Sequence, residues 1–286
     1  MEDKLTLDKA IAEILNWIKQ DGDPEKSLKE IGNKVTSKER YQNCAQWILS
    51  RPEFQDWSKG WYPLEDRRAS KRVIWINGPY GTGKTTIVYR VVSELQSLSE
   101  HYLQGEGANN EIPGNEGHPS RPMRVVPYFC TALTGESKRA DYQTIIRALS
   151  RKISLLPDFT LAQRAEALHS QNNRGLQELV GILAWEEFLR GLLRDDKGTT
   201  DFVFVIDALD ECDSSEEPVD SEKLLDFMRG LMGEFPNVQM LCSSRQHVPV
   251  QKYFGDEILY KVGALAAPAE GEIIKRPSPN LKKAPP

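Results

Sequence analysis

Eight consecutive residues combine glycine, lysine and threonine in a pattern that suits phosphate binding. The stretch "GPYGTGKT", Gly78–Thr85, fits the spacing G-x-x-x-x-G-K-[ST], follows a short apolar run and precedes a helical pattern. Its glycines let successive backbone N–H groups face one anion, and the helix N-terminus adds partial positive charge. We predict that the nucleotide-binding residues are Gly78, Pro79, Tyr80, Gly81, Thr82, Gly83, Lys84, Thr85 and Thr86.

A second stretch, "FVFVIDALDEC", places three acids at the end of an apolar run. Taken alone, it is equally compatible with a buried strand that ends in a solvated acidic turn. Because a phosphate-binding loop lies upstream, we expect Asp207 to hold Mg²⁺ beside the hydroxyl of Thr85, while Lys84 neutralises the β- and γ-phosphates. Asp210 or Glu211 would orient or deprotonate the attacking water, and the sequence does not choose between them.

A third stretch, "LCSSRQ", ends a strand pattern in polar residues. Ser243, Ser244 and Arg245 could face the terminal phosphate there, and Arg245 would bring a fixed positive charge to it. We therefore count Arg245 with Asp210 and Glu211 as a catalytic candidate. The alternative is an arginine on a solvated loop.

The elements that must position these residues alternate along the chain. Strand patterns occur in "RVIWIN", "MRVVPYFC", "DFVFVID", "VQMLCSSR" and "EILYKV", and helical patterns lie between them. This alternation predicts an α/β fold with a mostly parallel sheet covered on both faces. Because the first strand leads into a phosphate-binding loop, the expected fold resembles that of the P-loop NTPases, with three α/β/α layers and a five-stranded sheet. In the helix after the second strand, Arg147 and Arg151 are expected on a solvated face.

The ends of the chain differ in composition from this core. Residues 1–68 are predicted to form a small helical region, with helices at about 6–20, at about 38–50 and through "PEFQDWSK". We expect the first helix to pack on the core, with self-association as the alternative. Residues 69–262 would form the NTPase core with a mobile insertion at 104–122, and residues 263–286 a disordered Pro/Lys-rich tail.

Composition excludes some classes of protein. The net charge of −5 does not suggest a nucleic-acid or membrane binder, and there is no apolar run long enough to span a bilayer. The acidic, mixed N-terminus does not resemble a signal peptide. Four cysteines lie far apart, so we expect reduced structural thiols in a cytoplasmic protein. The four histidines are too scattered for a metal cluster.

Together, the three stretches resemble the NACHT branch of the signal-transduction P-loop NTPases. The similarity is to the nephrocystin-like N-terminal segment of fungal NLR-like proteins, and it spans roughly Tyr41 to Val262, including "CAQWILSRPEFQDW". The resemblance implies a sensor strand between the strands that carry the phosphate-binding loop and Asp207. It also implies a nucleotide-driven switch, closed with a diphosphate and open to oligomerise with a triphosphate.

The resulting functional hypothesis is a signalling NTPase core that binds ATP or GTP and acts as a Mg²⁺-dependent switch with slow hydrolysis. Its partners would be the nucleoside triphosphate and effector or sensor proteins, or further copies of the chain, with no nucleic acid. The family's lid and winged-helix domains have no counterpart in this sequence. A non-hydrolysing interaction module that keeps a P-loop fold, or a truncated and inactive NACHT fragment, is therefore the alternative.

Overall fold

The structure is a computed structural model of the 286-residue chain. It describes residues 2–18, 28–33, 45–59, 72–103, 121–130, 141–173, 181–212, 220–255 and 258–263. The predicted insertion falls almost wholly outside these residues, as does the predicted tail after Gly263.

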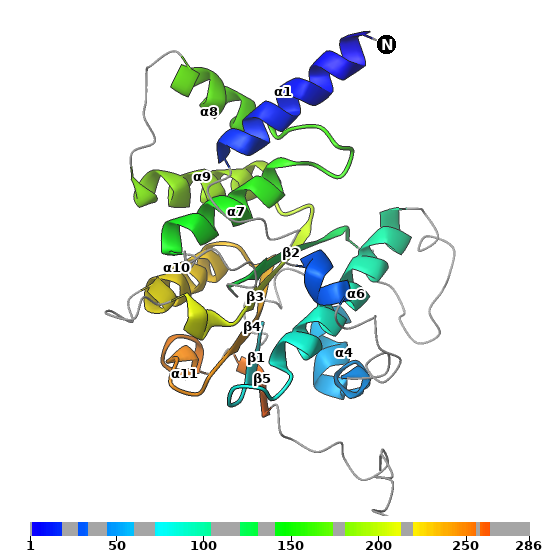
Figure 1. The fold of residues 1–286 in the computed structure, drawn as a ribbon, viewed down its shortest axis with the longest axis vertical. Coiled ribbons are helices and arrows are strands. Elements are labelled where there is room, and N and C mark those ends of the chain that lie inside the picture. The colour runs from blue at the N-terminus through cyan, green and yellow to red at the C-terminus, as the bar shows by residue number, and fades with distance from the viewer. Residues whose placement is uncertain are drawn as a thin grey trace, which may run out of the picture.

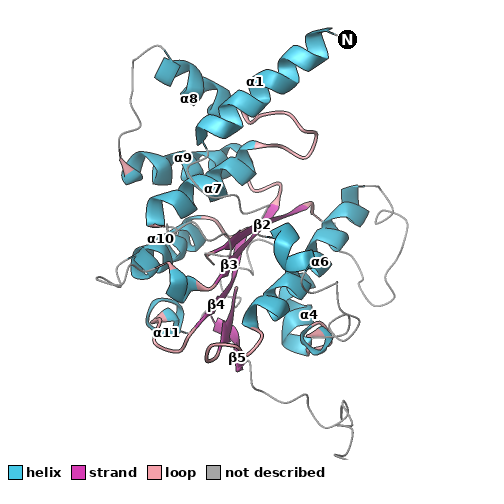
Figure 2. Cartoon of the chain, in the orientation of Figure 1, coloured by secondary structure: helices cyan, strands magenta, loops and turns pink. Residues whose placement is uncertain are grey.

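A parallel sheet forms the centre of the fold (Figures 1 and 2). The strands are β1 (Val73–Asn77), β2 (Met123–Phe129), β3 (Asp201–Asp207), β4 (Val238–Ser244) and β5 (Ile258–Gly263). Their order is β2-β3-β4-β1-β5, and all four pairings are parallel. The predicted α/β class is confirmed, and β4 lies between β1 and β3, as the family resemblance implies.

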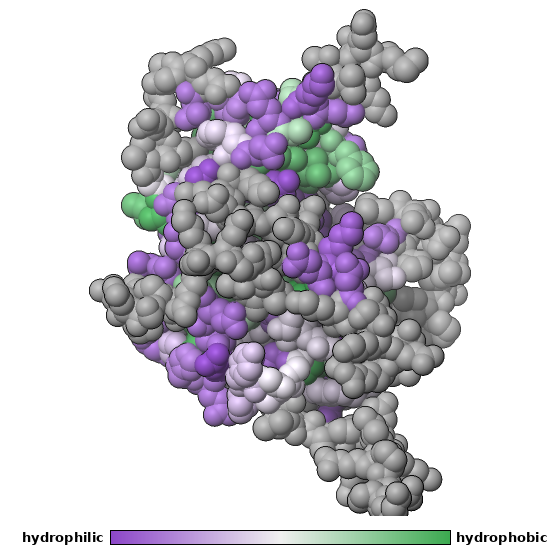
Figure 3. Space-filling model, viewed as in Figure 1, coloured by the Kyte–Doolittle hydropathy of each residue, from purple (hydrophilic) through white to green (hydrophobic). Residues whose placement is uncertain are grey.

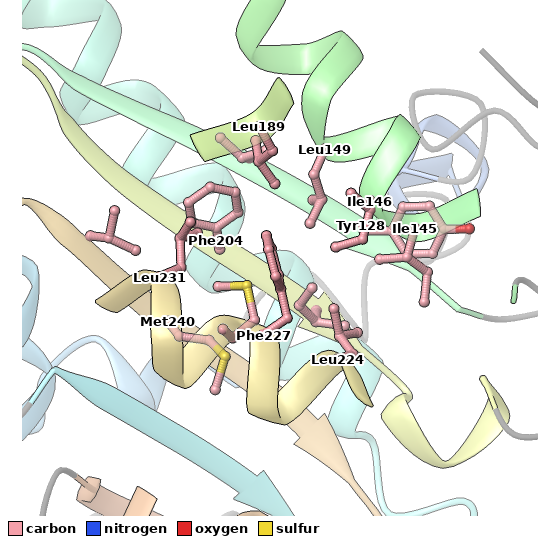
Figure 4. Packing of buried hydrophobic residues seen from close by; sticks show 14 of the residues in the cluster. Tyr128, Ile145, Ile146, Leu149, Leu189, Phe204, Leu224, Phe227, Leu231 and Met240 are labelled. Carbon is pink, nitrogen blue, oxygen red and sulfur yellow. The ribbon is translucent and has the colours of Figure 1, made fainter. Parts of the chain in front are cut away.

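Each core strand has a nearly continuous apolar sequence because both faces of the sheet are covered. All residues of β1 and β3 are buried. Alternate residues enter two separate cores: Phe204 and Met240 lie on one face, whereas Val205 and Leu241 lie on the other. Figure 4 shows the first of these cores, in which side chains from the sheet pack against side chains from the helices that cover this face.

Helices cover both faces of the sheet. One face carries α7 (Tyr142–Ser154), α9 (Ile182–Asp195), α10 (Asp220–Glu234) and the short α11 (Val250–Phe254), and α8 (Gln163–Asn173) packs beyond α9. The opposite face carries α6 (Lys84–Leu103), with η1 (Gln46–Ile48) and α4 (Pro52–Lys59) beside it. This arrangement is the predicted three-layer architecture.

The N-terminal helix α1 (Glu2–Ile18) packs on the core, as expected, through Ile14, Leu15 and Ile18. Two arginines of α7 hold its C-terminal end. Arg147 donates to the carbonyls of Trp17 and Ile18 at 2.8 and 2.9 Å. Its guanidinium also lies 4.5 Å from the ring centroid of Trp185.

The expectation that these arginines are solvated is therefore wrong. Arg151 also binds α1, because its Nε donates to the carbonyl of Leu15 at 3.2 Å. The last carbonyls of a helix have no partner within the helix, and arginine side chains can satisfy them. Periodicity alone showed that Arg147 and Arg151 lie off the apolar stripe of α7, and it could not show a second helix crossing there.

The N-terminal residues divide between the two faces of the sheet. Whereas α1 joins the core of α7 and α9, Ile48, Phe54 and Trp57 join the core beneath α6. Of the helix predicted at about 38–50, the described part is a turn and the short 3₁₀ helix η1. Ala45 has a φ of 64°, which an α-helix cannot accommodate.

A buried arginine at the start of β1 ties the sheet to α10. Arg72 donates from Nη1 to the carbonyls of Phe235 and Val238, and from Nη2 to that of Met232 at 2.8 Å. The backbone carbonyl of Arg72 accepts from the indole of Trp57 at 3.1 Å. These bonds fix the entry of the strand that leads directly into the phosphate-binding loop.

Few of the large apolar side chains in the described residues are exposed. Hydrophilic residues dominate the coloured surface in Figure 3, and an apolar area lies over the connection between α7 and α8. That connection contains Phe159, whose side chain is 77% exposed. Among the described residues, no helix is both long and apolar enough to cross a membrane.

Candidate functional site

The predicted phosphate-binding loop connects β1 directly to α6. Gly81 and Gly83 have φ angles of 76° and 84°, a region that glycine adopts at little cost. The Gly78 N–H donates to the carbonyl of Ser244 at 3.3 Å, which joins the start of the loop to the end of β4. The loop therefore lies at the carboxyl edge of the sheet, where ligands bind in open α/β folds.

Lys84 begins α6 and folds back over the loop. Its Nζ donates to the carbonyls of Gly78 and Pro79 at 2.8 and 2.9 Å. Thr82 Oγ1 also donates to the carbonyl of Pro79 at 2.8 Å. The ammonium group thus stands over the same loop whose N–H groups lead into the helix N-terminus, and both favour an anion.

Asp207, the last residue of β3, is fully buried and lies near Thr85. Its Oδ1 accepts a hydrogen bond from Ser243, and the Ser243 Oγ accepts from the Ala208 N–H at 2.9 Å. The second oxygen, Oδ2, is buried and has no hydrogen-bond partner among the described residues. A buried carboxylate oxygen without a partner is costly, so this atom indicates a ligand.

The electrostatics of Asp207 point the same way. Burial raises the pKa of this carboxyl group, whereas the Ser243 hydrogen bond, the Thr85 hydroxyl and the charge on Lys84 lower it. A carboxylate oxygen beside a threonine hydroxyl is the donor set that P-loop NTPases use for Mg²⁺, completed by phosphate and water oxygens. The two residues predicted as metal ligands, Thr85 and Asp207, therefore fit this ion.

The two remaining acids have different surroundings. Ala208 adopts a left-handed conformation, and the 3₁₀ helix η2 (Leu209–Glu211) follows it, so the chain turns sharply after Asp207. Asp210 forms an ion pair with Arg245 at 2.9 Å and accepts from the Arg245 backbone N–H, also at 2.9 Å. The predicted catalytic residues Asp210 and Arg245 are thus brought together, one residue away from Glu211.

Arg245 also approaches the phosphate-binding loop. Its guanidinium carbon lies 5.7 Å from the ring centroid of Tyr80, whose side chain is 82% exposed. The solvated-loop alternative for Arg245 does not describe this arrangement, because the arginine contacts both Asp210 and the loop. The sequence motifs at the ends of β1, β3 and β4 therefore converge on one edge.

Two serines at this edge do not have the role expected from the sequence, and one asparagine there was not predicted. Ser243 supports Asp207, and Ser244 Oγ accepts from the indole of Trp75 at 2.9 Å, so both serve the protein interior instead of facing a phosphate. Asn77, the last residue of β1, is buried, and its Nδ2 has no partner within the described ranges. In the sequence, the position of Asn77 immediately before the phosphate-binding loop could have indicated that it belongs to the site.

The cysteine expectation needs a correction at the same edge. Cys130 and Cys212 form a disulfide, with their Cα atoms 5.7 Å apart, and Cys242 is a buried free thiol. Phe129 pairs with Asp207 in the sheet, so β2 and β3 end side by side and bring the two cysteines together. Their separation of 82 residues concealed this proximity in the sequence.

Comparison with known proteins agrees with these observations. Residues 43–245, more than half of the chain, match the family model described as nephrocystin 3, N-terminal. The chain belongs to the nephrocystin 3 N-terminal family. The matched segment of this nephrocystin-type chain contains the phosphate-binding loop, the acidic turn and Arg245.

A curated relative and two solved structures are similar to this nephrocystin-type chain. The vegetative incompatibility protein HET-E-1 of Podospora anserina is 25% identical over 169 residues, which cover 58% of this chain and 10% of that protein. C. elegans PCH-2 is 14% identical, with a TM-score of 0.35 over 86% of this chain and 44% of its own. The Aeropyrum pernix ORC2 protein is also 14% identical, with a TM-score of 0.38 over 75% and 47%.

Proposed function

We propose that the chain is a nucleotide-binding signalling NTPase core, which binds ATP or GTP with Mg²⁺ and acts as a molecular switch with slow hydrolysis. One observation carries the proposal: the buried Oδ2 of Asp207, which has no hydrogen-bond partner among the described residues, lies near Thr85, beside a loop with the geometry of a phosphate-binding loop. If the loop bound no ligand, there would be no reason for a buried carboxylate oxygen beside it to lack a hydrogen-bond partner.

The chain's own groups would divide the work. The loop N–H groups and Lys84 bind and neutralise the phosphates, whereas Thr85 and Asp207 hold Mg²⁺. When bound, Mg²⁺ offsets the charge on the transferring phosphoryl group. Because Arg245 occupies both oxygens of Asp210, we assign the orientation of the attacking water to Glu211.

The switch and its context are part of the same proposal. A diphosphate would favour a closed state, and a triphosphate an open state that recruits an effector, a sensor or a second copy of the chain. The relative HET-E-1 is by its name a vegetative incompatibility protein, which supports a signalling role. We place the NTPase core at residues 69–262, preceded by helical residues 1–68, in a cytoplasmic protein.

The first test is a fluorescence titration with labelled ADP and ATP, with and without Mg²⁺. We expect saturable binding that Mg²⁺ strengthens and that Lys84→Ala loses. Lys223→Ala, on the exposed surface of α10, is the matched control and should bind as the wild type does. If the wild type binds neither nucleotide, the proposal is wrong.

Hydrolysis is tested separately. Phosphate release by Glu211→Gln should fall at least tenfold, because a neutral amide orients water less effectively than a carboxylate does. Nucleotide affinity should stay within about twofold of the wild type, since Glu211 acts on the water and not on the bound phosphates. If the wild type and Glu211→Gln both release phosphate no faster than Lys84→Ala does, a non-hydrolysing interaction module is favoured instead.

A further inference from the structure

We infer that Asp210 is a positioning residue, which holds Arg245 toward the phosphate-binding loop so that the site distinguishes a nucleoside triphosphate from a diphosphate. The inference rests on the proposed nucleotide site and gives one of its acids a role other than water activation. It follows from the two contacts between Asp210 and Arg245, the burial of the Asp210 side chain and the place of Tyr80.

Asp210 is poorly placed to serve as a base. Its side chain is only 5% exposed, and a single residue engages both of its oxygens. Oδ2 contacts the Nε of Arg245 at 2.9 Å, and Oδ1 accepts from the Arg245 backbone N–H at the same distance. A buried carboxylate requires such partners to compensate for its lost solvation.

These two contacts hold Arg245 at both ends. One fixes its backbone where β4 ends, and the other fixes its side chain at Nε, which leaves the two Nη nitrogens at the far end of the guanidinium. The guanidinium carbon is 5.7 Å from the ring centroid of Tyr80, so this group extends from the acidic turn to the phosphate-binding loop. Nearby, the carbonyl of Ser244 accepts from the Gly78 N–H.

The contact with Asp210 matters because the Arg245 side chain is otherwise only partly held by the protein. Its side chain is 45% exposed, and a long exposed side chain loses rotamer entropy when it binds a ligand. Because Asp210 already restricts the rotamers of Arg245, less entropy would be lost when the nucleotide binds. A diphosphate and a triphosphate differ by one terminal phosphate, so a guanidinium fixed at one side of the loop can select between them.

The test is a double-mutant cycle measured by equilibrium binding. For each protein, the dissociation constants of ADP and of a non-hydrolysable ATP analogue are measured with Mg²⁺, and the ADP constant is divided by the analogue constant. Asp210→Asn should lower this ratio at least fivefold while the ADP constant stays within about twofold. Arg245→Ala should lower the ratio at least as much.

The decisive comparison is the double variant. In the Arg245→Ala background, Asp210→Asn should lower the ratio no further, because the residue it positions is gone. Asp226→Asn, which neutralises an exposed acid on α10, is the matched control and should keep the wild-type ratio. An unchanged ratio in Asp210→Asn, or an equal loss in both backgrounds, overturns the inference.

Folding defects can be separated from this effect. The melting temperature of each variant is recorded, and if Asp210→Asn is unfolded, Arg245→Lys replaces it. Lysine keeps the charge but has no Nε to hold, so the inference requires the ratio to fall, and a wild-type ratio overturns it. Failure of the wild type to bind either nucleotide would contradict the proposed function itself, whereas normal binding with an unaltered ratio contradicts only the role of Asp210.

Discussion

Gly83 shows how a single residue sets the shape of the phosphate-binding loop. Its φ of 84° is disfavoured for any residue with a Cβ, yet a Cβ built at this position would meet nothing within 4 Å. Gly83→Ala should therefore cost about 1–2 kcal/mol of stability through the backbone alone, or shift the loop and weaken nucleotide binding. Urea unfolding and nucleotide titration measure the two effects.

Gly181 provides a control for this substitution. A Cβ there also meets nothing within 4 Å, but the φ of Gly181 is −143°, which alanine adopts easily. Gly181→Ala should change neither stability nor binding appreciably. Equal effects of the two substitutions would show that the loop does not depend on the left-handed conformation.

At the scale of residues, the sequence indicated which residues belong to the candidate site, but it did not indicate most of the contacts between them. Thr85 and Asp207 could be paired from the two motifs and their order in the chain, because parallel strands bring their carboxyl ends to one edge. The division of roles between Asp210 and Glu211 could not, since it depends on the left-handed Ala208 and on the side chain of Arg245. The resemblance implied that β4 lies beside β3, but it did not predict the hydrogen bond from Ser243 to Asp207 between these strands.

The docking of α1 can be tested through its arginine contacts. Arg147→Ala leaves the carbonyls of Trp17 and Ile18 without these partners and removes the contact with Trp185. We expect a loss of about 1–3 kcal/mol in the free energy of unfolding, and faster proteolysis within α1. Arg151→Ala, which removes one longer bond, should have a smaller effect.

Deletion of residues 1–20 is the stronger form of this experiment. It should lower the melting temperature and the solubility, because α7 and α9 would lose the apolar cover that Ile14, Leu15 and Ile18 provide. A truncated protein that melts and dissolves as the full chain does would show that α1 does not stabilise the core.

An ion-pair network joins α9 to α10 and predicts a dependence on pH. Burial tends to raise the pKa of Glu234, but hydrogen bonds from Arg190 and Arg194 outweigh it and hold this pKa below its usual value. The pKa is thus lower in the folded than in the unfolded state. The stability that these pairs contribute is complete above the unfolded pKa of about 4.3 and is lost as the pH falls through the folded pKa.

Substitution of Glu234 checks this dependence. At pH 7, Glu234→Gln should be less stable than the wild type by about 0.5–1 kcal/mol, since the pair is partly exposed. Urea unfolding at decreasing pH should show that this difference disappears. Glu166→Gln, on the exposed surface of α8, should show no such trend, and a constant difference for Glu234→Gln would contradict the sign of the shift.

At the scale of elements, prediction succeeded where burial is nearly complete. The strand β3 was predicted at its observed bounds because a strand covered on both faces leaves a continuous apolar run. Periodicity does not indicate the helix α8, because its sequence, "QRAEALHSQNN", has few apolar residues, of which Ala165 is buried. Its position depends on tertiary contacts that periodicity does not record.

The disulfide links distant parts of the whole molecule and can be removed reversibly. Cys130 and Cys212 close a loop of 82 residues between the end of β2 and the acidic turn. Reduction should lower the free energy of unfolding by about 2–4 kcal/mol, mainly because the unfolded chain gains freedom. Thermal melting with and without a thiol reductant, together with mass spectrometry of the linked peptide, measures this contribution.

A variant separates reduction of this bond from other effects of the reductant. Cys130→Ser combined with Cys212→Ser should melt at the temperature of the reduced wild type, and reductant should not change it further. If reductant leaves the melting temperature of the wild type unchanged, the two cysteines are not linked in solution.

The placement of α1 affects how the chain folds as it is synthesised. Ile18 and its hydrogen-bond partner Arg147 are 129 residues apart. At about 5–20 residues per second, the ribosome needs roughly 6–26 s to complete that interval. During this time α1 lacks the surface of α7 that covers its apolar stripe in the folded chain, so we expect a nascent chain to expose this stripe until α7 emerges. A helix that is made early therefore docks late in folding.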